Sequence, residues 1–275
     1  MYQQDGQADL ALQSYTGAAQ AAPGEYFAIR ADDLLNERTP FTRPAGAQFE
    51  FDDAQEQAEA EAWLRTTFGI QQAGPLAALS PALQADPRLI RGTELWNLAD
   101  FAEAKVEFES LRVAYANDGL ALYQLTLYYR DIGLYRSSII AAADLLRLAR
   151  ADNFTAPRFL VRLRYPVYYK DLVLPEAEKH DVDPLLIFSL IRQESLFESF
   201  ATSFAAAQGL MQIIPSTGFE IQQRIGWPAE YENEDVYRPY INVVFGVDYL
   251  RWTLNLVDNQ PYAALAGYNG GRRTP

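Results

Sequence analysis

The stretch FSLIRQESLF, residues 188–197, has the composition of a buried helix, yet Glu194 lies on its apolar side. Side chains four and seven positions apart share one face of an α-helix, and here that face also holds Ile187, Leu190 and Ile191. A carboxyl group held against apolar side chains is costly to ionise, so its pKa rises and it can donate a proton at neutral pH. The other interpretation is that Glu194 ends its helix and points into water.

The composition limits the class of partner. The chain has 275 residues, 49% of them hydrophobic, and a formal net charge of −13. This charge argues against nucleic acid or an anionic membrane as the main partner. There is no cysteine, so disulfides and thiol chemistry are excluded, and a single histidine, His180, argues against a histidine-rich metal site. We therefore expect neither a metal nor another cofactor.

Two features of the sequence bear on where the chain acts. No apolar run is long enough to span a bilayer. The first residues, MYQQDGQADL, lack the basic and then apolar pattern of a signal peptide. Either the protein is not exported, or this chain starts downstream of its natural N-terminus.

Most of the chain has helical composition, with abundant Ala and Leu. Residues 52–70 form one expected helix, which ends near Gly69. The segments 93–116 and 118–150 resemble each other at an offset of 34 residues, the period of tetratricopeptide-like helix pairs. The offset pairs Leu95, Leu98, Ala99 and Phe101 with Tyr129, Ile132, Gly133 and Tyr135. Stacked antiparallel pairs should bury five side chains of this region: Leu95, Phe101, Leu125, Leu134 and Tyr135.

A change of organisation follows these repeats. Prolines at positions 157, 166 and 175 are expected to interrupt helices, and we place a domain boundary near Tyr165. Residues 1–164 would form the helical arm and residues 165–275 a second domain. In that domain we expect four helices: one capped by Asp183 with Pro184 first, one from Pro215 to Gly226, an amphipathic one with Val244, Val247, Leu250, Leu254 and Val257 on its apolar face, and a short one at residues 261–271 that runs into a glycine turn.

Three motifs follow one another in the second domain. The segment IRQESLFESFATSFAAAQGLMQIIPSTG, residues 191–218, contains Glu194-Ser195, Ser203, Gly209-Leu210-Met211-Gln212 and Pro215. Asn242, Gly246 and Tyr249-Leu250 share one expected helix, and AGYNGG, residues 266–271, fits the pattern Ala-x-Tyr-Asn-x-Gly. In order and spacing these motifs resemble the soluble lytic transglycosylase family, lysozyme-like enzymes that cleave peptidoglycan.

The resemblance implies a mainly α fold, in which a lysozyme-like α domain is preceded by a tetratricopeptide-like α-superhelical arm. It implies that Glu194 is the single catalytic acid and base, which cleaves the β-1,4 bond between N-acetylmuramic acid and N-acetylglucosamine and forms a 1,6-anhydromuramic acid end. No second carboxylate is then required, unlike the usual glycosidase pair. The substrate-binding residues that it implies are Ser195, Ser203, Met211, Gln212, Ile214, Tyr268 and Asn269.

Several of these positions have a simpler interpretation. Ser195 can bond only backbone at the helix end, Met211 fits a core position, and Tyr268 can be an ordinary half-buried tyrosine. Glu198 is expected at the surface. The family usually has Gly-Ala where this chain has Ala206-Ala207, which is tolerable if the backbone angle φ of Ala206 is negative.

The resemblance also sets expectations for the whole protein. Family members continue past Tyr-Asn, whereas this chain stops at GRRTP, so we expect a domain truncated at its C-terminus. The expected partner is the peptidoglycan glycan strand in the periplasm or cell envelope, with cell-wall protein partners on the arm and a monomeric chain. Two alternatives remain open: a hydrolytic muramidase like the goose-type lysozymes, and a non-catalytic glycan-binding scaffold.

Overall fold

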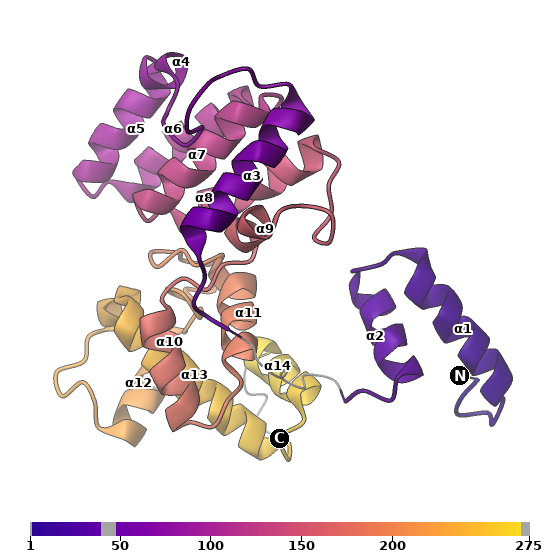
Figure 1. Cartoon of the computed structure of the whole chain (residues 1–275). Helices are drawn as coiled ribbons and strands as arrows, with labels where there is room; N and C mark the ends of the chain where they lie inside the picture. Colours follow the sequence, from indigo (N-terminus) through magenta and orange to yellow (C-terminus); the bar gives the residue numbers. More distant parts are fainter. Residues whose placement is uncertain (1, 40–47, 271–275) are drawn as a thin grey trace. The chain divides into compact units, whose positions relative to one another are not determined.

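The structure is a computed structural model that describes residues 2–39 and 48–270 (Figure 1). Within these residues it is built of helices, and the pairing of extended backbone is limited to the isolated bridges Thr202–Gln208 and Gln208–Ile213. The mainly α fold is therefore confirmed. No helix in the described ranges has both the length and the apolar character that crossing a membrane requires. The last position of the AGYNGG motif, Gly271, and the GRRTP end lie outside the described residues.

Residues 1–47 form one compact unit and residues 48–275 another. In the first, helices α1 (Ala8–Ala21) and α2 (Tyr26–Leu35) pack against each other. Their contact buries small side chains, those of Ala11, Ala28 and Ala31.

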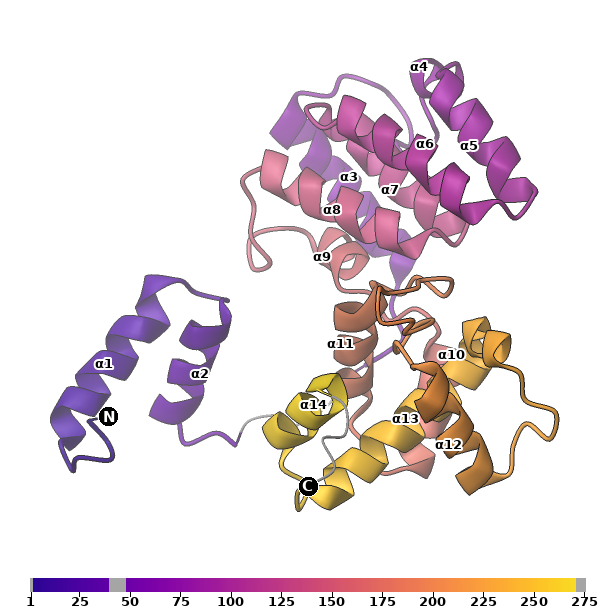
Figure 2. The same cartoon turned by 180° about the vertical axis from the view of Figure 1, so that it is seen from behind.

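The second unit begins with a group of helices that we call the arm helices. They are α3 (Asp53–Phe68), α4 (Pro81–Gln84), α5 (Pro87–Asn97), α6 (Phe101–Ala114), α7 (Gly119–Asp131), α8 (Tyr135–Leu148) and α9 (Arg158–Arg164). Helix α3 starts where the Asp52 side chain accepts a hydrogen bond from Gln55 N, and it ends at Gly69, whose φ of +65° suits glycine. Both views of the cartoon show the arm helices side by side as one group (Figures 1 and 2).

The repeat of 34 residues is confirmed by the two helix turns. Ala99 joins α5 to α6 with a φ of +61°, and Gly133 joins α7 to α8 with a φ of +83°. Each turn is closed by an equivalent backbone hydrogen bond, Asp100 N to Leu95 O at 3.0 Å and Leu134 N to Tyr129 O at 2.8 Å. The same chain reversal therefore occurs at equivalent positions of both pairs.

The burial expected in the arm is only partly correct. Leu125 and Leu134 are buried, whereas Leu95, Phe101 and Tyr135 are partly buried. Two of the three are turned toward the following helices rather than into the arm. The Phe101 ring stacks on Phe200 at 5.1 Å, and the Tyr135 ring stacks on Tyr168 at 3.9 Å. These rings form part of the junction between the arm helices and the rest of the unit.

The remaining elements, which we call the C-terminal helices, pack around a further apolar core, to which Ile139 of α8 also contributes. They are α10 (Lys170–Lys179), α11 (Pro184–Ser195), α12 (Pro215–Ile225), the 3-10 helix η1 (Asn233–Tyr237), α13 (Pro239–Leu256) and α14 (Pro261–Gly270). Two predicted starts and one predicted end are confirmed: Asp183 caps α11 through Leu185 N at 2.8 Å, Pro215 starts α12, and Gly226 ends it with a φ of +71°.

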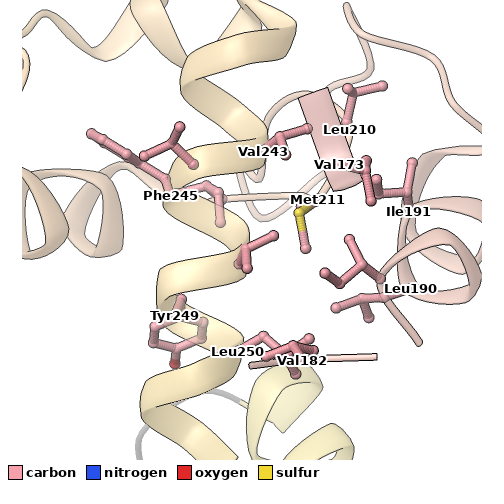
Figure 3. Packing of buried hydrophobic residues seen from close by; sticks show 14 of the residues in the cluster. Val173, Val182, Leu190, Ile191, Leu210, Met211, Val243, Phe245, Tyr249 and Leu250 are labelled. Carbon is pink, nitrogen blue, oxygen red and sulfur yellow. The ribbon is translucent and has the colours of Figure 1, made fainter. Parts of the chain in front are cut away.

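One expectation for this region is wrong, and another is only partly correct. Pro175 lies inside α10 rather than at its end, so the helix continues past a residue that has no N–H to donate. Helix α13 is not simply amphipathic, because α10, α12, α14 and η1 all pack against it. Side chains next to one another in its sequence, such as Val243, Val244 and Phe245, are all buried. It is the central helix of this core (Figure 3).

Candidate functional site

Glu194 lies in the last turn of α11, where the apolar helix meets a cavity. Its neighbours Ile187, Leu190 and Ile191 are buried, as the helical spacing predicts. The Glu194 side chain is itself half-buried, and this desolvation raises its pKa above the ordinary value of 4.5. No hydrogen bond or ion pair holds its carboxyl group within the described residues. The group is thus kept uncharged more readily than a surface glutamate and is accessible from the cavity.

The chain turns sharply directly after this glutamate. Leu196 and Phe197 have φ values of +52° and +64°, in the left-handed region that costs a non-glycine residue roughly 1–2 kcal/mol. The surrounding structure offsets this cost, since Phe197 is buried and its ring meets Tyr168 edge-on at 5.6 Å. The turn ends α11 one residue after Glu194, so the carboxyl group lies at the open end of the helix.

The cavity beside Glu194 has a volume of about 410 Å³. It brings together most of the residues that the sequence motifs indicated, although they come from four parts of the chain. Its lining includes Glu194, Ser203, Gln212, Ile214, Tyr268 and Asn269. Its apolar wall comes from Ile213, Ile214 and the ring of Tyr249. A carboxyl group, amide and hydroxyl groups, and a flat aromatic wall in one concave site suit a sugar chain.

One side chain of α13 holds the Gly-Leu-Met-Gln turn in place. Asn242 is fully buried; its amide donates to Gln208 O at 2.9 Å and Val236 O at 2.7 Å, and its Oδ1 accepts from Met211 N at 2.7 Å. The close approach requires glycine at position 209, where φ is +74° and a Cβ would lie 2.2 Å from the Asn242 amide nitrogen.

Met211 is a core residue, as its simpler interpretation predicted, and not a cavity residue. Its side chain lies between α13 and the helix that carries Leu190 and Ile191 (Figure 3). A Cβ on Gly246 would lie 2.2 Å from the Met211 sulfur, so α13 needs glycine at this position. The function of Met211 in the site is to fix the backbone that presents Gln212 to the cavity.

The hydroxyl of Tyr268 fixes the same backbone from the other side. It donates to Met211 O at 2.8 Å, and burial, with the nearby Glu194 charge second, raises the pKa of Tyr268 well above its ordinary value. Tyr268 therefore stays neutral and forms part of the wall beside Glu194. Its ring meets Tyr249 at 5.2 Å, and the two tyrosines together form one side of the cavity.

The polar residues near Glu194 differ in what they can offer a ligand. Ser195 donates to Leu210 O at 2.8 Å and is buried, which agrees with its interpretation as a backbone-bonding residue. Ser203 Oγ accepts from Ala205 N and Ala207 N, which leaves its hydroxyl hydrogen for a ligand. The Gln212 amide nitrogen donates to Gly209 O at 2.9 Å, while Asn269 is exposed at the cavity rim.

Two expectations for the loop after α11 are corrected. Ala206 has a φ of +58°, so the condition under which alanine replaces glycine without strain is not met. Glu198 is not at the surface, because only 7% of it is exposed. Its two carboxylate oxygens accept hydrogen bonds from Lys105 Nζ of α6, at 3.0 Å and 3.1 Å. The physical reason is that α6 covers this loop, which the sequence of the loop alone does not reveal.

The site residues inferred from the sequence did not include Tyr249 and Thr217, which line the cavity, or Asn242, which holds the Gly-Leu-Met-Gln turn. A signal for two of them was present. Asn242, Gly246 and Tyr249 are spaced by four and three residues, so they share one face of α13. That face meets the Gly-Leu-Met-Gln turn through the first two residues and the cavity through Tyr249.

This fold and this site define a lysozyme-like α domain. Residues 171–274 match the family model described as the Transglycosylase SLT domain. Two curated relatives are named "Membrane-bound lytic murein transglycosylase C". The protein from Actinobacillus pleuropneumoniae is 32% identical over 112 residues, which are 38% of this chain and 30% of the relative. The one from Haemophilus ducreyi is 28% identical over 206 residues, 68% of this chain and 52% of the relative.

Two solved structures share the fold. An inactive mutant of the lytic transglycosylase Slt from Pseudomonas aeruginosa matches with a TM-score of 0.62 at 20% identity, over 96% of this chain and 42% of that one. The 70-kDa soluble lytic transglycosylase from Escherichia coli matches with a TM-score of 0.57 at 20% identity, over 95% of this chain and 43% of that one. The chain thus spans about a third to a half of the length of the relatives that it matches. The resemblance to the lytic transglycosylases that the motifs indicated is confirmed.

Proposed function

We propose that this chain is the catalytic part of a peptidoglycan lytic transglycosylase that acts in the cell envelope. The observation that carries the proposal is the desolvated Glu194 carboxyl group in a cavity whose lining has no second carboxylate within the described residues. A glycosidase that works with two carboxyl groups needs the second one within about 5–10 Å, as nucleophile or as base for water. The nearby Glu198 is engaged by Lys105.

The proposed reaction uses Glu194 twice. The protonated carboxyl group gives its proton to the oxygen that leaves C1 of N-acetylmuramic acid. The resulting carboxylate then takes the proton of the 6-hydroxyl group of the same sugar, whose oxygen forms the new bond to C1. The glutamate ends the cycle protonated, and no water is consumed. Ser203, Gln212 and Asn269 would bond the sugar substituents, and Tyr268, Tyr249 and Ile214 would contact the rings.

The division of the chain into a helical arm and a lysozyme-like domain is also a proposal. We place the start of the lysozyme-like domain near Tyr165, between the end of α9 and the start of α10. Its support is that the buried side chains of the C-terminal core come from residue 173 onward, with Ile139 of α8 as the exception, whereas the two arm clusters take theirs from residues 60–163. The monomeric state and the binding of cell-wall proteins to the arm stay proposals of the same kind.

The products of the reaction test the proposal directly. Purified peptidoglycan incubated with the protein should release muropeptides that end in 1,6-anhydromuramic acid, about 18 Da lighter than the hydrolysis product because no water is added. Mass spectrometry of the soluble fraction distinguishes the two ends. Reducing ends would assign the chain to the hydrolytic muramidases, and the absence of any released fragment would support the glycan-binding scaffold.

The pH dependence of the rate should reflect the desolvation of Glu194. The first step needs the protonated form, which is lost as the pH rises through the folded-state pKa; because burial raises that pKa, kcat/KM should begin to fall at a pH above the ordinary 4.5. The same sign applies to folding: the contribution of Glu194 to stability is fully present below its unfolded-state pKa and is lost as the pH rises through the folded-state pKa. A pH–rate profile on soluble glycan strands measures the pH at which kcat/KM falls. A fall centred at or below pH 4.5 would contradict a desolvated Glu194.

A further inference from the structure

Glu194 borders a second hollow, which opens toward the arm helices. This hollow has a volume of about 310 Å³ and shares Glu194, Ser203 and Gln212 with the first cavity. These three residues therefore stand between two spaces. Unlike the first cavity, the second is also lined by Arg136, from α8 of the arm helices.

The arm helices are fastened to this side of the site by two contacts around the loop after α11. Lys105 of α6 binds the buried Glu198, and the Phe101 ring stacks on Phe200 at 5.1 Å with an interplanar angle of 23°. A third contact lies one residue before Arg136: Tyr135 stacks on Tyr168 at 3.9 Å and meets Tyr169 at 5.4 Å. The backbone of Arg136 is thus held against the C-terminal helices by its neighbour.

No interaction within the described residues explains why position 136 carries a charged side chain. Within the described residues its guanidinium group has neither an ion-pair nor a hydrogen-bond partner, whereas Arg147, on the same helix, is paired with Asp144 at 2.9 Å. Arg136 is also the second residue of α8, where a cation opposes the positive end of the helix dipole at a cost of about 0.3–1 kcal/mol. Arg136 therefore combines a charge that is unfavourable for its own helix with a position in the lining of a hollow.

The hollow is lined by charged groups of both signs. Two carboxyl groups also line it, Glu194 and Glu198. Lys105 neutralises Glu198, and burial raises the pKa of Glu194 and so favours its uncharged form. Arg136 is then the uncompensated charge of the hollow, in a chain whose net charge is −13.

We propose that Arg136 is a specificity-determining residue that binds a carboxylate carried by the glycan strand on the arm side of Glu194. The inference rests on the proposed function, since it assigns the class of substrate to that site: strands with acidic substituents rather than neutral sugar chains. In peptidoglycan the carboxylate has two sources, the lactyl group of a peptide-free muramic acid and the stem peptide. Arginine suits both, because its planar guanidinium group forms paired hydrogen bonds to a carboxylate.

Binding measurements with three ligands of equal length test the assignment. Calorimetry uses the full chain with Glu194→Gln, so that no ligand is cleaved, with and without Arg136→Gln. The ligands are a neutral N-acetylglucosamine oligosaccharide, a peptide-free strand with lactyl carboxylates, and a strand with stem peptides. Arg136→Gln should weaken binding of one or both acidic strands about tenfold, equivalent to about 1.4 kcal/mol, and leave the neutral ligand unchanged. The acidic strand that responds identifies the source of the carboxylate.

Two control variants separate recognition from structure. Arg136→Lys should restore part of the affinity for the acidic strand, and Arg147→Gln should change neither ligand class, because Arg147 lies on the same helix but outside the hollow. An equal loss for acidic and neutral ligands, or no loss for either acidic strand, overturns the inference. Failure of the wild-type chain to release anhydro ends from peptidoglycan would overturn the proposed reaction instead. The two outcomes are distinguishable, because the binding experiment uses the Glu194→Gln chain and short ligands.

Discussion

Replacement of Glu194 by glutamine should abolish the release of anhydromuropeptides while the protein stays folded. The amide has the shape of the carboxyl group but can neither give a proton to the leaving oxygen nor accept one from the 6-hydroxyl group. Loss of general acid–base catalysis costs about a hundredfold or more, and here one residue serves in both steps. The measurement is the rate of fragment release from purified peptidoglycan.

The stability of the same variant provides the control on folding. Glu194 is half-buried and its pKa is raised, so its charged form is unfavourable in the folded state at neutral pH. Glu194→Gln removes that charge, and its melting temperature should equal or exceed that of the wild type. Glu230→Gln, the same change at an exposed position of the C-terminal domain, should alter neither property. A folded Glu194→Gln variant that keeps substantial lytic activity would falsify the assignment.

Replacement of Asn242 by leucine should produce the largest loss of stability and should also disable the site. Leucine is similar in size but leaves Met211 N–H and Val236 C=O without a partner, whereas Gln208 C=O keeps its hydrogen bond from Ile213 N at 3.1 Å. Each buried polar group left unpaired costs about 1–3 kcal/mol, so we expect a total of about 2 kcal/mol or more. For a domain of this size that lowers the melting temperature by roughly 4–8 °C.

The activity of the Asn242 variants tests the link between this side chain and the cavity. Met211 directly precedes Gln212, so release of its backbone should displace Gln212 and lower kcat/KM even where the protein remains folded. Asn242→Asp keeps the acceptor for Met211 N but sets a carboxylate oxygen against the carbonyl oxygens of Gln208 and Val236, so it should be at least as destabilising as leucine at neutral pH. Asn255→Leu, at an exposed position of the same helix, is the matched control. Wild-type stability of Asn242→Leu would show that the turn holds itself in place.

Local patterns in the sequence were enough for the helices and for much of the site. Asp183 with Pro184, and Pro215 with Gly226, mark helix ends because capping depends on residues a few positions apart. The 34-residue offset predicted the two equivalent turns for the same reason: a helix pair and its reversal are encoded within one repeat. The apolar stripe of α11 likewise placed Glu194 in a half-buried position.

The tertiary structure alone decided the features that depend on segments far apart in the chain. Glu198 looks like a surface residue until Lys105, 93 positions earlier, is brought against it. Tyr135 and Phe101 appear as arm-core residues, but their rings complete the junction with the C-terminal helices. Arg136 has no motif around it, and only the tertiary structure brings it to the same hollow as Glu194. Propensity and periodicity describe contacts within a few turns, whereas the partner of a buried charge is chosen by how whole helices pack. For this reason the half-buried Glu194 could be found in the sequence, and a neighbour that comes from a distant helix, such as Arg136, could not.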